Sequence, residues 1–151
     1  AFIKRFYHDY LGARDAYEYL NRVNDSDPVP FYNLGSLYGY YLNERAKAIP
    51  KFEAAIQRDS VHASFYLGFA DFYREVMNDS PSAEKVLLRG LFKVPADANI
   101  LIAMGVLYKT MGNFSKAVEY YEKVLASSSL PDSERPRITA ELERLKQSAE
   151  Q

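Results

Sequence analysis

Cysteine and tryptophan are absent from the 151-residue chain, and histidine occurs only as His8 and His62. Without cysteine there can be no disulfide bond, no catalytic thiolate and no cysteine-based zinc site. Neither histidine lies four residues from another metal ligand in a zinc-like motif, and no glycine-rich phosphate loop, Gly-x-Ser-x-Gly or His-Glu-x-x-His motif is present. The sequence therefore predicts no metal site, no cofactor and no enzymatic activity.

Charge of one sign is not in excess either, because the formal net charge is −1. A nucleic-acid-binding surface requires clustered Lys and Arg, and a membrane-surface patch requires a polybasic segment. No stretch approaches the roughly 18 consecutive apolar residues of a membrane-spanning helix. We therefore expect a protein or peptide partner, no nucleic acid and no direct membrane insertion. The compartment stays open, with the cytoplasm favoured.

What the chain does have is apolar and aromatic material, with 48% hydrophobic residues and thirteen tyrosines. Residues 98–131 predict two amphipathic helices folded back on each other. In the first helix, the apolar residues recur at steps of three and four: Leu101, Met104, Tyr108 and Met111. Gly112-Asn113 predicts the turn, and the second helix restores the helical period with Phe114, Ala117, Val118, Tyr121, Val124 and Leu125. Gly105 and Ala117 are the small residues at which the two helices are expected to approach most closely.

The same order of residues recurs upstream at a spacing of 34 or 35 residues. The positions that recur in the first helix are Phe31/Tyr66/Leu101, Leu34/Phe69/Met104, Gly35/Ala70/Gly105 and Tyr38/Tyr73/Tyr108. Those of the second helix are Ala48/Ala83/Ala117, Phe52/Leu87/Tyr121 and Ala55/Gly90/Val124. Two of the three copies contain one extra residue, which we assign to the loop inside the helix pair.

This pattern resembles the tetratricopeptide repeat, whose signature runs W-x2-L-G-x2-Y, A-x3-F and a closing P. Leu101 stands in the Trp place, Met104-Gly105 in the Leu-Gly place and Tyr108 in the Tyr place. Ala117 and Tyr121 follow in the Ala and Phe places, while Ser129 occupies the closing Pro place, two residues before Pro131. The resemblance implies an all-α fold, a right-handed superhelical solenoid of antiparallel helix pairs.

We divide the chain into a degenerate repeat (1–27), three repeats (28–60, 61–95 and 98–131) and a capping helix (132–151). In the degenerate repeat, Phe2, Ile3, Phe6, Tyr7 and Tyr10 are expected to share a helix face, with a turn at Leu11-Gly12. Ala16, Leu20 and Val23 then correspond to the second helix. The final helix has an apolar face that steps through Ile138, Leu142, Leu145 and Ala149, and it is expected to cover the last repeat.

Two helix starts need a specific interpretation because proline lies nearby. Pro50 removes a helix hydrogen bond unless it lies near the start, so the helix that contains it is expected to begin at about Arg45 to Lys47. Ser80, followed by Pro81, is the expected cap and first-turn pair of another helix.

The resemblance also implies where a partner binds, because members of the family bind peptides or helices on the concave wall formed by their first helices. Carrying the repeat phase along the chain predicts the following groove residues: Tyr32, Ser36, Tyr40, Leu67, Asp71, Arg74, Asn99, Ile102, Val106 and Lys109. For any one of them, packing between neighbouring repeats is an equally good interpretation.

Chaperone-binding members hold a carboxylate with a Lys/Asn/Arg clamp, whose places are taken here by Tyr32, Asn33, Ser36, Asn99 and Ala103. That clamp is therefore not expected, and the mixed aromatic and aliphatic wall suits an apolar or helical segment. The sequence predicts a non-catalytic scaffold or adaptor. Two alternatives stay open: a self-associating assembly protein, and an interaction module of a larger enzyme or membrane protein. The chain begins directly on the apolar segment AFIKRFY, as expected of a fragment or processed form.

Overall fold

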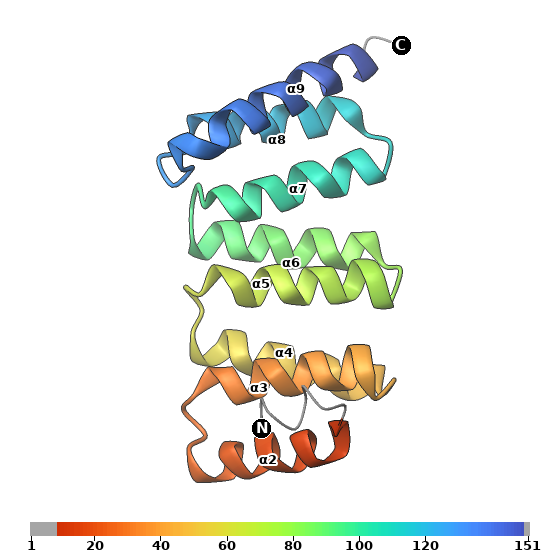
Figure 1. Ribbon diagram of the computed structural model, residues 1–151, viewed down its shortest axis with the longest axis vertical. Helices are drawn as coiled ribbons and strands as arrows, with labels where there is room; N and C mark the ends of the chain where they lie inside the picture. Colours follow the sequence, from red (N-terminus) through yellow and green to blue (C-terminus); the bar gives the residue numbers. More distant parts are fainter. Residues whose placement is uncertain (1–8, 150–151) are drawn as a thin grey trace.

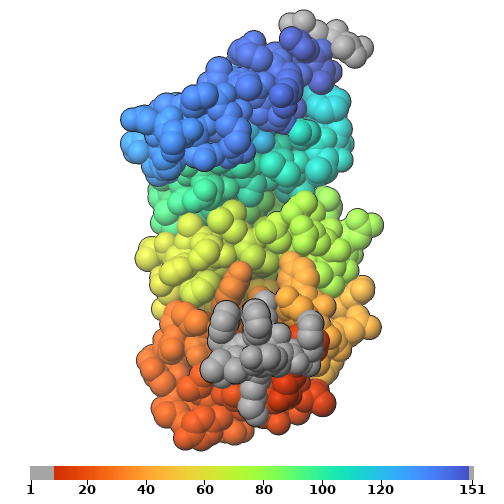
Figure 2. Space-filling view, in the orientation of Figure 1, coloured from red at the N-terminus to blue at the C-terminus, as the bar shows by residue number. Residues whose placement is uncertain are grey.

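The computed structural model describes residues 9–149, and every regular element within that range is helical. The elements are α2 (Tyr10–Val23), α3 (Pro28–Ser36), η1 (Leu37–Tyr41), α4 (Arg45–Arg58), α5 (Ala63–Asp71), η2 (Phe72–Val76), α6 (Ser80–Lys93), α7 (Ala98–Thr110), α8 (Phe114–Ala126), η3 (Asp132–Glu134) and α9 (Arg135–Ala149). The helices stack along the long axis of the molecule from α2 at one end to α9 at the other (Figure 1). In the space-filling view their layers follow one another as a single elongated body (Figure 2). The fold is thus an all-α solenoid.

Consecutive helices pair, with α3 against α4, α5 against α6 and α7 against α8, and the next element along the chain stacks on each pair. A small residue of the first helix lets an aromatic ring of the second come close. A Cβ atom added at Gly35 would lie 2.9 Å from the Phe52 ring, and one added at Gly105 would lie 2.5 Å from the Tyr121 ring. The close approach expected at Gly105 is therefore confirmed.

Acidic and amide side chains cap five of the helices. The side-chain oxygens of Asp9, Asp27, Asp79, Asp97 and Asn113 each accept a hydrogen bond from an amide in the first turn that follows. Such caps satisfy amides that have no partner within the helix. The cap of α6 is Asp79, whose Oδ1 lies 3.0 Å from the Ser82 amide nitrogen. The prediction of Ser80 was one residue off, because Asp79 supplies the acceptor and Ser80 is already helical.

The extra residue of the two longer repeats lies in the last turn of the first helix and not in the loop. Both η1 and η2 are π-helical turns that continue α3 and α5. The Leu42 amide bonds the Leu37 carbonyl at 3.0 Å, and the Met77 amide bonds the Phe72 carbonyl at 3.2 Å. The shorter repeat has no such turn, since α7 stays α-helical to Thr110. An extra residue absorbed in this way widens one turn and keeps the loop length unchanged.

Helix α4 begins at Arg45, which confirms the interpretation of Pro50. Pro50 is exposed and lies in the second turn. Its missing amide therefore removes only one early hydrogen bond, and its ring faces away from the core.

The N-terminal unit differs from its predicted phase. Residues 1–8 lie outside the described residues, and with them the predicted face of Phe2, Ile3, Phe6 and Tyr7. Leu11 and Gly12 belong to α2 and form no turn. The helix buries Ala13 and Tyr17, while Leu20 and Val23 are exposed. Ala13 and Tyr17 precede Ala48 and Phe52 by 35 residues, so α2 has the phase of a second helix, three residues earlier than expected from Ala16.

At the other end, α9 lies on α8 and buries Ile138, Leu142 and Leu145. Ala149, the last position of the predicted apolar face, is exposed. Arg135 reinforces the junction because its Nη1 donates to the Leu125 carbonyl at 2.8 Å. Between residues 9 and 149 no helix combines the length and apolarity required to cross a bilayer.

Candidate interaction surface

The predicted groove residues lie on the first helices of the three repeats, in columns that follow the repeat period. Tyr32, Leu67 and Ile102 occupy one column, one turn before the column of Ser36, Asp71 and Val106. Arg74 and Lys109 lie one further turn along η2 and α7, and Tyr40 lies in η1. Residues of one column occupy equivalent positions on successive first helices, so their side chains follow one another along the stack.

Five of these residues line one cleft of about 200 Å³ between α5, η2 and α7: Asp71, Arg74, Asn99, Ile102 and Val106. The cleft also contacts residues that the sequence did not predict as groove residues: Ala70, Ala83, Leu87, Ala103 and Leu107. Ala70, Ala83 and Leu87 are repeat positions, and Ala103 was considered only as a place of the chaperone clamp. The signal that could have found them is the small size of Ala70 and Ala103, which opens the floor of the cleft toward α6.

The two cations among the predicted groove residues, Arg74 in the cleft and Lys109 beyond it, are already paired. One Nη of Arg74 lies 2.8 Å from both Asp71 Oδ1 and Glu75 Oε1, and the hydrogen bond to Asp71 raises the pKa of Arg74. The Lys109 ammonium lies 2.5 Å from Glu141 Oε1 of α9, and this bond raises the pKa of Lys109. Paired cations are poor ligands for an additional carboxylate, so the accessible surface of the cleft is set by the half-buried Ile102 and Val106 together with the exposed amide Asn99.

Two tyrosines of the predicted wall lie away from the cleft, toward the N-terminal repeats. The Tyr32 ring packs 5.1 Å from that of Phe65 and 5.7 Å from that of Phe52. A Cβ atom added at Gly68 would overlap the Tyr32 hydroxyl, so Tyr32 fills the space between α3 and α5. The Tyr40 ring rests edge-on against Phe72 at 6.3 Å, remains 40% exposed, and has a pKa raised by its burial.

The remaining predicted residues, Ser36 and Leu67, are half-buried on α3 and α5. Leu67 packs against the core cluster. The predicted groove residues therefore recur at the repeat period in all three repeats, but a cleft is formed among them only where α5, η2 and α7 meet. No group of three potential metal-ligating side chains comes together within residues 9–149.

The chain is similar to known proteins in one of its repeats and in its fold. Residues 98–129 match the tetratricopeptide repeat family. The solved structures of similar fold include a crystal structure of MamA, with a TM-score of 0.64 and 19% identity over 97% of this chain and 92% of that one. A second MamA crystal structure aligns with a TM-score of 0.63 and 21% identity over 97% of this chain and 84% of that one.

A MamA double mutant aligns with a TM-score of 0.59 and 17% identity, over 93% of this chain and 86% of that one. The sequence has no match among curated proteins. At these identities the structural likeness concerns the fold. The match thus identifies residues 98–129 as a tetratricopeptide repeat, and the likeness to the MamA structures shows that the chain as a whole has the fold of a helical solenoid.

Proposed function

We propose that the chain is a non-catalytic scaffold that binds an apolar or helical segment of a partner protein in the cleft of α5, η2 and α7. The observation that supports this most is the character of Ile102 and Val106, which are only half-buried although both are aliphatic. The repeat pattern requires burial at Leu101, Met104 and Gly105, and places no such demand on these two positions.

The chemistry of the cleft favours apolar side chains over a charged terminus. Ala70, Ala103 and Leu107 extend the aliphatic surface inward from Ile102 and Val106. The ion pair of Arg74 with Asp71 borders it. A cleft of about 200 Å³ has room for one or two anchoring side chains, as in the helix-in-groove and extended-peptide modes of recognition.

The test is Val106→Glu, compared with Val23→Glu as the matched control. Val23 is 64% exposed at the end of α2, far from the cleft. In the unbound Val106→Glu variant the introduced carboxylate can reach water, so we expect circular dichroism to report an intact fold. Against an apolar ligand the same carboxylate is desolvated, and we expect partner affinity to fall at least about thirtyfold.

The measurement is affinity capture with identification of the bound proteins, followed by titration of each against both variants. Tyr32→Ala is a weaker probe because Tyr32 packs between α3 and α5. A folded Val106→Glu variant that retains every partner of the unmodified chain would be inconsistent with binding in this cleft. Loss of self-association alone would favour an assembly protein.

A further inference from the structure

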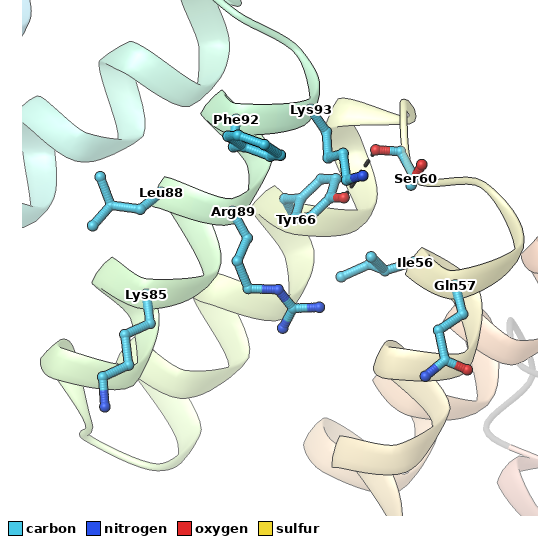
Figure 3. Close-up of a pocket in the computed structure, with 9 residues that line it drawn as sticks. All are labelled: Ile56, Gln57, Ser60, Tyr66, Lys85, Leu88, Arg89, Phe92 and Lys93. Carbon is cyan, nitrogen blue, oxygen red and sulfur yellow. Dashed lines mark hydrogen bonds between the residues drawn. The ribbon is translucent and has the colours of Figure 1, made fainter.

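A second and larger cavity, of about 720 Å³, lies between the second helices α4 and α6. Ile56 borders it from α4, Leu88 and Phe92 border it from α6, and Tyr66 of α5 lies between them (Figure 3). The Tyr66 hydroxyl donates to the Ser60 carbonyl at 2.8 Å, which fixes the ring in this position. We call this site the outer groove, because it is formed on the side of the second helices.

Two apolar residues of the outer groove are not required by the repeat. Leu88 corresponds in phase to Glu53 in the preceding repeat and Glu122 in the following one. Phe92 corresponds to Gln57 and Ala126. Leu88 is 44% exposed and Phe92 is 79% exposed. A single repeat that replaces these polar or small residues with a leucine and a phenylalanine presents an apolar patch for binding and not for folding.

Basic residues accompany this apolar pair along α6. Lys85, Arg89 and Lys93 follow one another at steps of four, and no carboxylate lines the groove. Arg89 is engaged by Glu53, with its two Nη atoms 2.8 and 2.9 Å from the carboxylate oxygens. Within the described part of the chain, Lys85 and Lys93 have no carboxylate at ion-pair distance. The chain as a whole has a net charge of −1, so this positive charge is local.

We propose that the outer groove binds an acidic amphipathic helix of a partner protein. Apolar side chains of that helix would enter between Leu88, Phe92 and Ile56, and its carboxylates would pair with Lys85 and Lys93. Eight residues separate the two lysines, a rise of about 12 Å along α6. Carboxylates about two turns apart on a helix lying along α6 span that distance. A groove that accepts inserted side chains suits such a helix better than the flat surface of a bilayer.

The probe is a fluorescein-labelled helical peptide about five turns long, with Leu and Phe on one face and Glu on both flanks. Its matched control has Lys in place of every Glu. We expect the Glu peptide to bind at least about tenfold more tightly than the Lys peptide, measured by fluorescence anisotropy at low salt. Equal affinity for the two peptides would overturn the proposal.

Variants of the chain test each half of the proposal. Phe92→Ala should weaken binding of the Glu peptide about tenfold. Because Phe92 is exposed, we expect this variant to fold normally. Lys85→Glu combined with Lys93→Glu should reverse the preference toward the Lys peptide. Arg45→Glu, which changes charge at the far end of α4, should leave binding unchanged. Binding that survives Phe92→Ala, or a preference that does not reverse, would contradict the proposal.

Two further arms distinguish other occupants and the other surface. Val106→Glu should leave peptide binding unaltered, which separates the outer groove from the cleft of α5, η2 and α7. Vesicles of phosphatidylcholine with phosphatidylserine should not retain the chain; retention that depends on Phe92 and both lysines would identify a lipid surface instead. A concentration-dependent dimer in sedimentation, abolished by Phe92→Ala, would identify a second copy of the chain as the occupant.

Discussion

Replacing Gly105 with leucine is expected to lower the free energy of unfolding by roughly 1–3 kcal/mol. The first side-chain carbon alone would lie 2.5 Å from Cε2 and 2.6 Å from Cδ2 of Tyr121. Tyr121 is buried, so its ring cannot move into solvent without loss of packing. The gain in helix propensity over glycine, about 1 kcal/mol, only partly offsets this clash. Urea denaturation measures the effect.

The preceding repeat, residues 61–95, supplies a control for this prediction. Its residues at the positions of Gly105 and Tyr121 are Ala70 and Leu87, a larger and a smaller side chain. We therefore expect Gly105→Ala to destabilise the chain alone, and to be partly compensated by Tyr121→Leu. A coupling of about 0.5–3 kcal/mol in the double-mutant cycle would be typical of residues in contact. Gly105→Leu with unchanged stability would show that the repeat phase is misassigned.

Deleting residues 132–151 is expected to have the largest effect on solution behaviour. The deletion removes Ile138, Leu142 and Leu145, the buried residues of α9, and is expected to uncover the partly buried Phe114, Val118 and Leu125 of α8. The end of a solenoid without a covering element exposes its apolar face. We expect the shortened chain to aggregate or dimerise, as measured by light scattering and sedimentation.

A point variant tests the same interface without removing the helix. Leu142→Ala should cost about 2–5 kcal/mol, the range for truncating a buried leucine. Gln147→Ala, on the exposed face of α9, serves as the control and should change stability by less than about 0.5 kcal/mol. If the shortened chain stays monomeric and as stable as the full one, α9 does not act as a cap.

The helix pairs could be predicted from the sequence because most residues that recur at the repeat period are those that pack between the paired helices. Gly105 was expected, together with Ala117, to mark the closest approach of α7 and α8, and the Tyr121 ring of α8 does lie against Gly105. The period alone could not distinguish an extra loop residue from a π-helical turn. A longer loop and a π-helical turn place the same number of residues between Tyr38 and Ala48. They differ in the carbonyl that accepts the hydrogen bond of the Leu42 amide, which is Leu37 in the π-helical turn.

The N-terminal phase was wrong because one small residue was mistaken for another. Ala13 and Ala16 both fit the small position, and only the 35-residue distance from Ala13 to Ala48 identifies the correct one. Tyr32 shows a different limit. Its position on the first helix predicts the concave wall, but contacts with Phe65 and Gly68, supplied by the next repeat, draw its ring into packing.

The outer groove was not predicted, although its signal is present in the sequence. Aligning the repeats places Leu88 with Glu53 and Glu122, and Phe92 with Gln57 and Ala126. The positions that the repeats share are mainly those of the core. The positions at which one repeat departs from the others are more informative about a surface, because packing leaves them free to vary.

Site-specific photo-cross-linking tests the central claim most directly. A photoreactive phenylalanine analogue at Val106 lies in the cleft of α5, η2 and α7, whereas the same analogue at exposed Thr139 lies on the outer face of α9. The proposed function predicts that partner proteins cross-link from position 106 and not from position 139. The same partners captured from both positions, or from position 139 alone, would contradict binding in the cleft.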